Sequence, residues 1–151
     1  MIDFLKKGKE LNNIHVGVSI EHVYNILGEP DEVIGDKKNG YLHYQENRYG
    51  YDEKGKVIEM SIEFTRLKVK YDFHNLESEH YGISIQKSFS INTKTKIHKF
   101  IAFLNFLQLD WEANSKLDKD YLTIKISSGA YILFDLHDGK SYRISVVDGY
   151  Q

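Results

Sequence analysis

The stretch GVSIEHVYNILGEP, from Gly17 to Pro30, decides the fold of this chain. Ser19 stands where its hydroxyl can cap a first helical turn, and Gly28 followed by Pro30 ends the helical pattern. Between these signals the apolar side chains recur at the i, i+3, i+4, i+7 spacing of one helix face: Ile20, Val23, Tyr24 and Leu27. The stretch therefore predicts a short helix with a defined start and end.

Strand patterns follow Pro30. We expect hairpin turns at DKKNG (36–40) and DEKG (52–55), because glycine accepts the positive φ that such turns need. The pattern predicts strands at 32–34, 41–44, 48–51 and 57–64.

The strand 57–64 alternates between two kinds of side chain. Ile58, Met60, Ile62 and Phe64 are expected on a buried face, and they alternate with Val57, Glu59, Ser61 and Glu63 on a wet one. The alternation continues from Leu67 in the opposite phase, which predicts a bulge or tight turn near Thr65 and Arg66.

A second helix is predicted from about 93 to 107, with an apolar stripe through Ile97, Phe100, Ile101, Leu104 and Leu107. Before it, residues 74–80 read as a polar loop and residues 81–85 as a strand. After it, Trp111 is expected in a loop, and strands are expected at 121–126, 130–136 and 141–147.

The two halves of the chain resemble each other. YDEKGKVIEMSI (51–62) aligns with FDLHDGKSYRISV (134–146) when the second turn has one residue more, and each segment follows its helix at a similar distance. We therefore expect an α+β fold in a single domain, 1–151, made of two tandem helix-plus-antiparallel-strand units at about 12–75 and 90–148. The helices would pack on an antiparallel sheet and leave its other face free.

Composition excludes several classes of function. The chain has 151 residues and no cysteine, which excludes disulfides, thiolate metal sites and a cysteine nucleophile. A net charge of -2 argues against nucleic-acid binding by phosphate neutralisation. No apolar run reaches the roughly 18 residues of a membrane span, and the N-terminus lacks the apolar core of a signal peptide. These features predict a cytoplasmic protein without a membrane partner.

Sequence motifs for chemistry are weak. The seven histidines form no His-x-x-x-His pair, so no metal site and no cofactor are expected. The Gly-Lys pairs at 55 and 139 lack the upstream glycine of a phosphate-binding loop. His137 and Asp138 occupy a predicted turn, and no residue is assigned a catalytic role. A noncontiguous enzyme site with His43, His137 and Asp135 remains the alternative.

The helix segment resembles the motif of the small outer-membrane assembly lipoproteins of the SmpA/OmlA family. The residues that carry this resemblance are Gly17, Val18, Ser19, Val23, Leu27, Gly28 and Pro30. The tandem arrangement is similar to that of the secreted β-lactamase inhibitor proteins, in which two such units grip an enzyme with a concave sheet. Without cysteine, neither the lipid anchor of the first family nor the disulfides of the second carry over. The resemblance implies the helix-plus-strand fold of these families and a role in binding other proteins.

In character the chain also resembles the immunity proteins of polymorphic and contact-dependent toxin systems. We expect an immunity protein that binds a cognate toxin and covers its active surface. A nuclease is one kind of toxin that fits this expectation. Acidic groups would stand where a nuclease expects phosphates, and tyrosines would exclude water. The candidate contact residues are Tyr49, Tyr51, Glu53, Glu59 and Glu63. A structural or regulatory protein-binding domain is a further alternative.

Overall fold

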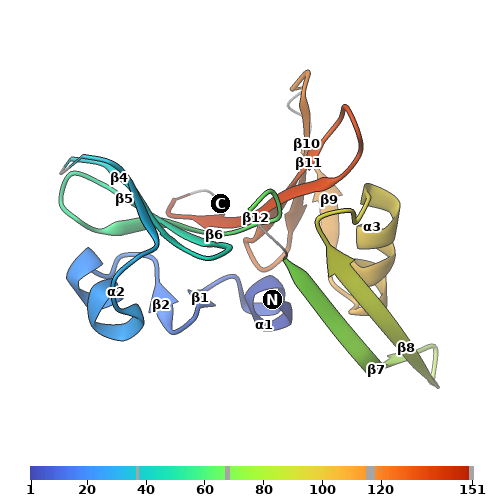
Figure 1. The fold of residues 1–151 in the computed structure, drawn as a ribbon. Helices are drawn as coiled ribbons and strands as arrows, with labels where there is room; N and C mark the ends of the chain where they lie inside the picture. The colour runs from blue at the N-terminus through green and yellow to red at the C-terminus, as the bar shows by residue number, and fades with distance from the viewer. Residues whose placement is uncertain (37, 67–68, 115–117, 150–151) are drawn as a thin grey trace.

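A computed structural model describes residues 1–36, 38–66, 69–114 and 118–149. Strands make up 50% of the described residues and helices 17%. The predicted α+β arrangement of helices packed on a sheet is therefore wrong. An eight-stranded antiparallel sheet dominates, and the helices of the described residues are three and short (Figure 1). The physical reason is that the apolar helical stripes are brief, whereas period-two patterns extend through segments that had read as loops.

The elements follow one another in a simple order. The helices are α1 (Ile2–Lys7), α2 (Ile20–Leu27) and α3 (Ile97–Phe106). The strands of the first half are β1 (Glu10–Leu11), β2 (Ile14–His15), β3 (Glu32–Gly35), β4 (Gly40–Tyr44), β5 (Asn47–Tyr51) and β6 (Val57–Glu63). The remaining strands are β7 (Lys70–His80), β8 (Ile83–Asn92), β9 (Trp111–Ala113), β10 (Tyr121–Ile126), β11 (Tyr131–Asp135) and β12 (Ser141–Val147).

The sequence signals around α2 are confirmed. Ser19 is the N-cap, and its side-chain oxygen accepts a hydrogen bond from the backbone N–H of His22 at 3.2 Å. Gly28 ends the helix with a φ of 79°, and its N–H donates to the carbonyl of Tyr24. The second helix is shorter than predicted, because its N-cap is Lys96, which makes no side-chain capping hydrogen bond.

The large sheet runs β3-β4-β5-β6-β12-β11-β10-β9. Each half of the chain thus supplies four consecutive strands, and the halves meet where β6 pairs antiparallel with β12. At that junction Ser61 lies opposite Ser145, and Ile62 lies opposite Ile144. The division into units at 12–75 and 90–148 remains a prediction, but the junction places the midpoint of the sheet at these residues.

Both halves join a helix to a glycine turn in the same way. The backbone N–H of Ile20, the first residue of α2, donates to the carbonyl of Gly55 at 2.9 Å. In the second half the N–H of Ile97 donates to the carbonyl of Gly139, also at 2.9 Å. The turn carbonyl therefore satisfies one of the helix N–H groups that have no partner within the helix.

A bulge changes the faces of β6. Tyr51 pairs with Val57 and Gly50 with Glu59, so Ile58 is the extra residue. Val57 is buried and Ile58 is 37% exposed, which is the opposite of the predicted assignment at this end of the strand. From Met60 onward the two faces alternate as predicted, with Met60 and Ile62 in the core. The expected wet face is wrong in its exposure, because Ser61 and Glu63 are also buried, beneath the arginines that pair with the glutamates. The predicted change of phase begins at Leu67, and this residue lies outside the described residues.

The hydrophobic core lies against one face of the large sheet. Side chains from the sheet, such as Met60, Ile132 and Phe134, are fully buried there. Phe4 and Leu5 of α1, Val23 of α2 and Phe100, Phe103 and Leu104 of α3 belong to the same cluster. Short helices and hairpins thus share the covering of this face (Figure 1).

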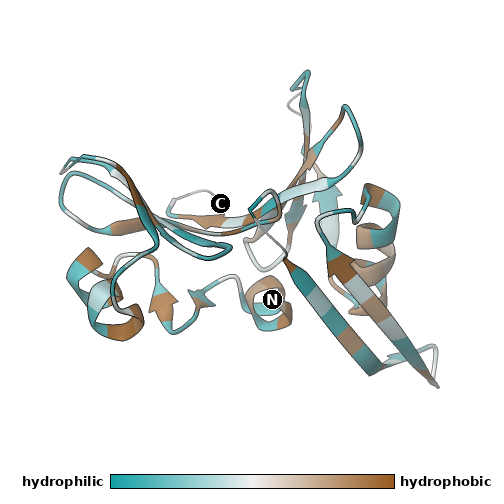
Figure 2. Ribbon diagram, viewed as in Figure 1, coloured by the Kyte–Doolittle hydropathy of each residue, from teal (hydrophilic) through white to brown (hydrophobic). Residues whose placement is uncertain are grey.

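The β7–β8 hairpin replaces the predicted loop at 74–80. Hydrophobic and hydrophilic residues alternate along both strands (Figure 2). Phe73 and Phe89 place their rings 5.3 and 5.1 Å from the ring of Phe103 on α3. The polar residues of 74–80 are mostly the outward positions of a strand, so the segment reads as a loop when its apolar partners on α3 are not considered.

Candidate functional site

The second face of the large sheet is the candidate site. In the part of the chain that the structure describes, no helix or strand lies over this face, and α1, α2 and α3 contribute to the core on the opposite one (Figure 1). We call it the uncovered face. Its side chains belong to residues that alternate with the buried apolar positions.

The centre of the uncovered face is a cluster of charged side chains. Arg48 on β5 lies opposite Ser61 on β6, so its guanidinium reaches both diagonal neighbours of that serine. Arg48 Nη2 donates to Glu59 Oε1 at 2.6 Å, and Arg48 Nη1 lies 2.8 Å from Glu63 Oε1. We call Arg48, Glu59, Glu63 and Arg143 the paired-charge cluster.

Hydroxyl groups support the cluster from the middle of the sheet. Ser61 Oγ donates to Glu59 Oε1 at 2.8 Å, and Ser145 Oγ donates to Ser61 Oγ at 3.1 Å. Both serines are buried. The pairing of β6 with β12 therefore fixes the position of the Glu59 carboxylate, because a chain of hydrogen bonds runs from Ser145 through Ser61 to Glu59.

Arg143 on β12 is more weakly paired than Arg48. Its Nη1 lies 3.7 Å from Glu59 Oε1, the oxygen that already accepts hydrogen bonds from Arg48 and Ser61. The Nε atoms of Arg143 and Arg48 are buried and make no hydrogen bond. Arg143 nevertheless keeps 21% of its side chain exposed, compared with 11% for Arg48.

Tyr41, His43 and Arg66 surround the cluster. The Arg48 guanidinium carbon lies 4.4 Å from the centre of the Tyr41 ring, which is a cation–π distance. His43 is buried, with Nδ1 3.9 Å from Glu63 Oε2, and Arg66 Nε lies 3.6 Å from the same oxygen. Arg66 also pairs with Glu32 on β3.

Two titratable groups respond to these charges. Burial raises the pKa of the Glu59 carboxyl, but the nearby Arg48, Ser61 and Arg143 outweigh it and hold the pKa below its usual value. Burial lowers the pKa of His43, and the neighbouring Arg66 and Arg48 lower it further, against a raising effect of Glu63 and Glu32. Glu59 is therefore ionised and His43 neutral at pH 7.

Beside the cluster, β10 and β11 present a less charged area. Leu133 lies opposite Arg143 on one side and Thr123 on the other. Tyr121 pairs with Asp135 at the end of β10, and its ring lies 5.3 Å from that of Tyr142. These side chains are partly exposed, so aromatic and aliphatic groups adjoin the cluster on the same sheet.

The five predicted contact residues divide between the two faces. Glu59 and Glu63 lie on the uncovered face and are joined by Arg48. The rings of Tyr49 and Tyr51 are 0% and 6% exposed in the core, so their expected role as surface anchors is wrong. Each follows the strand alternation and packs with the apolar residues, and Tyr49 donates its hydroxyl hydrogen to the carbonyl of Leu11 at 3.2 Å.

Glu53 stands apart from the other four. It is exposed in the turn between β5 and β6, beyond the strand positions that form the cluster. The structure therefore joins only the two central carboxylates of the predicted set.

Sequence reasoning missed Arg48 and Arg143. The signal was present in the strand parity: if Met60 and Tyr49 share the buried face, the neighbour of Tyr49 must share the face of Glu59. Predicting Arg143 also required the pairing of β6 with β12, a contact between residues more than 80 positions apart.

The residues of the alternative enzyme site are separated. His43 is on β4 and Asp135 is on β11, with β5, β6 and β12 between them. Four strand spacings correspond to roughly 19 Å. His137 is exposed and lies 3.2 Å from Asp120, not from His43. The structure does not bring these three residues into one site.

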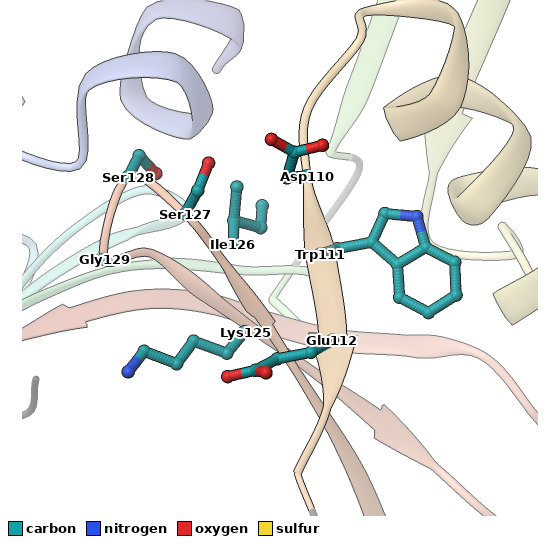
Figure 3. Close-up of a pocket in the computed structure, with 8 residues that line it drawn as sticks. All are labelled: Asp110, Trp111, Glu112, Lys125, Ile126, Ser127, Ser128 and Gly129. Carbon is teal, nitrogen blue, oxygen red and sulfur yellow. The ribbon is translucent and has the colours of Figure 1, made fainter.

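A pocket of about 520 Å³ lies at the other end of the sheet, between β9 and the β10–β11 turn. Lys125 and Glu112 extend to one side there, while Trp111 points away from them toward α3 (Figure 3). Trp111 Nε1 donates to Asn105 Oδ1 at 2.8 Å, which explains its orientation. The side chains do not converge on one point as those of a small-molecule site would.

Neither a metal site nor a membrane span is visible in what the structure describes. No three His, Asp or Glu side chains in residues 1–36, 38–66, 69–114 and 118–149 are grouped so that they could hold a metal ion. Over the same ranges, no helix has the length and apolar character to cross a membrane.

Comparison of the chain with protein-family models, with curated proteins and with solved structures gives no match.

Proposed function

We propose that this chain is a cytosolic immunity protein that binds a cognate toxin domain through the uncovered face and neutralises it by covering its active surface. The observation that carries the proposal is the combination, on one uncovered face, of charged side chains held in fixed positions and partly exposed aromatic and aliphatic groups beside them. Protein-binding surfaces favour arginine and tyrosine in this way.

Preorganisation supports a binding role. Arg48 holds Glu59 and Glu63 at 2.6 and 2.8 Å, and Tyr41 lies over its guanidinium. Side chains that are already ordered lose little conformational entropy when a partner binds, which favours affinity. A rigid sheet also keeps its backbone positions on association.

The ion pairs change the expected mechanism. Glu59 and Glu63 are each paired with arginine, so they do not offer the surplus negative charge that phosphate mimicry requires. The proposed inhibition is therefore steric: the toxin domain lies on the sheet, and tyrosine and leucine side chains exclude water from the contact. Resemblance to the β-lactamase inhibitor proteins is consistent with such use of a sheet.

Neutralisation of a toxin tests the proposal directly. A toxin domain captured with this protein from the native cell is expressed from an inducible promoter, with and without this protein, and cell growth is measured. We expect wild-type protein to restore growth and to co-purify with the toxin domain in a defined stoichiometry. Capture of no toxin from the native cell, or a captured toxin whose effect on growth is not relieved, would contradict the proposal.

A matched pair of variants locates the contact. Leu133→Glu places a charge on the uncovered face, and Ile26→Glu places the same charge on α2, where Ile26 is 41% exposed. We expect Leu133→Glu to abolish rescue and Ile26→Glu to retain it, with both proteins folded by circular dichroism. The opposite result would place the contact on the helical side.

A further inference from the structure

Guanidinium groups surround the two carboxylates of the paired-charge cluster. Arg48 and Arg143 both approach Glu59 Oε1, at 2.6 and 3.7 Å. The second carboxylate, Glu63, is shared by Arg48 and Arg66, at 2.8 and 3.6 Å. Arg66 has its own partner in Glu32 at the edge of the sheet, so the three arginines and three glutamates balance in charge. Arg143 is the arginine of this group whose only ion pair is long.

Arg143 has hydrogen-bonding capacity that the cluster does not use. A guanidinium carries five N–H donors, and the one ion pair of Arg143 is long. Its Nε is buried without a hydrogen-bond partner. The exposed part of the guanidinium is therefore the part that a ligand can reach, and an acceptor placed there would gain a charge-assisted hydrogen bond.

The directions of two pKa shifts agree with the positions of these arginines. A buried carboxyl ordinarily has a raised pKa, yet Arg48, Ser61 and Arg143 hold that of Glu59 below its usual value. After burial, the charges of Arg66 and Arg48 further lower the pKa of His43. The neighbouring guanidinium groups thus act on both residues, in addition to burial at His43.

We infer that Arg143, with Arg48 beside it, forms a docking point for a carboxylate side chain of the protein partner. This inference rests on the proposed function for the identity of the partner, but the anion site itself is a property of the free protein. The sequence led us to expect acidic groups of this chain to meet a basic toxin surface. In the inferred contact the charges are reversed, because the partner contributes the acidic group.

The geometry favours a carboxylate group as ligand. Arginine presents a planar fork that matches the two oxygens of a carboxylate. The exposed 21% of Arg143 lies next to Leu133, and partly exposed tyrosines lie farther along the same strands. An apolar border of this kind lowers the local dielectric and strengthens the charge-assisted bond.

Glutarate, a dicarboxylate, serves as the probe in the absence of the toxin. The Nε–Hε resonances of the arginines are followed by NMR during titration at constant ionic strength. We expect saturable shifts for Arg143 and Arg48, with a millimolar midpoint, and about tenfold weaker binding in Arg143→Gln. Lys99→Gln removes one exposed positive charge from α3 and is expected to leave the midpoint unchanged.

Equal, nonsaturable shifts of all arginines would show an adventitious ion only and overturn the inference. Unchanged binding in a folded Arg143→Gln variant would overturn it as well, and Arg143→Lys, which keeps the charge but not the fork, is expected to bind less tightly than wild type. Glutarate binding without any toxin partner would contradict the proposed function alone, whereas toxin binding that is indifferent to Arg143→Gln would contradict the docking point alone.

Discussion

The guanidinium of Arg48 lies 2.8 Å from the carboxylate of Glu63, across two adjacent strands on the uncovered face. The same guanidinium holds Glu59 at 2.6 Å. Because all three side chains are nearly buried, each charge depends on the others for its solvation. This dependence makes the cluster a property of the fold as well as of the proposed contact.

Arg48→Met is expected to destabilise the protein strongly, because it leaves Glu59 and Glu63 buried without their main partner. The loss in free energy of unfolding should be about 3 kcal/mol, as for other broken buried ion pairs. Urea denaturation measures it. Combining Arg48→Met with Glu59→Gln and Glu63→Gln should recover part of the loss, and a loss below about 1 kcal/mol in the single variant would contradict the burial of this cluster.

Lys96→Ser is expected to stabilise the protein. Lys96 is the N-cap of α3 and makes no side-chain capping hydrogen bond, whereas Ser19 caps α2. A serine at this position should add about 0.5–1 kcal/mol to the free energy of unfolding. Lys99→Ser, inside the same helix, is the control and should give no gain because serine has the lower helix propensity.

Acid should weaken the fold through His43. Burial, Arg66 and Arg48 lower its folded-state pKa below the ordinary 6.5, so the unfolded chain binds the proton more readily. Stability therefore falls as pH falls through 6.5 toward the folded-state pKa. The depressed pKa of Glu59 acts in a more acidic range: its contribution is present above the ordinary value of 4.5 and is lost as pH falls through the folded-state pKa.

The His43→Gln variant isolates the first of these effects. Free energies of unfolding measured between pH 8 and pH 5.5 should depend less on pH in the variant than in wild type. His22→Gln, at an exposed position on α2, should keep the wild-type dependence. Equal slopes for all three proteins would show that His43 does not contribute.

Tyr49→Phe separates a core role from a contact role. The Tyr49 hydroxyl donates to the carbonyl of Leu11 at 3.2 Å in the buried face, so its removal should cost about 1 kcal/mol of stability. Burial of this residue predicts unchanged affinity for the toxin domain, measured by calorimetry. A stability equal to wild type, or a loss of affinity in the folded variant, would contradict the placement of Tyr49 in the core.

The sequence correctly predicted the helix ends and strands that depend on residues close together in the chain. The cap at Ser19, the stop at Gly28 and the strands at 121–126 and 141–147 all match, because capping and alternation act within a few residues. The long β7–β8 hairpin was missed, since its apolar side chains are explained only by packing on Phe103 and Phe106 of α3.

The candidate site was harder to predict than the elements. Glu59 and Glu63 were found from the alternation of β6, but Tyr49 and Tyr51 were assigned by residue type and not by strand parity. The bulge at Ile58 changes the parity between the two ends of β6. Arg143 joins Glu59 only because β6 pairs with β12, and no local pattern specifies that pairing.

Chemical-shift mapping of the isotope-labelled protein in complex with its toxin domain tests the central claim most directly. We expect the largest changes on the uncovered face, at the side chains of Arg48, Leu133 and Arg143, with little change along α2 and α3. Changes concentrated on α2, on α3 or at the tip of the β7–β8 hairpin, with the Arg48 and Arg143 signals unmoved, would contradict it.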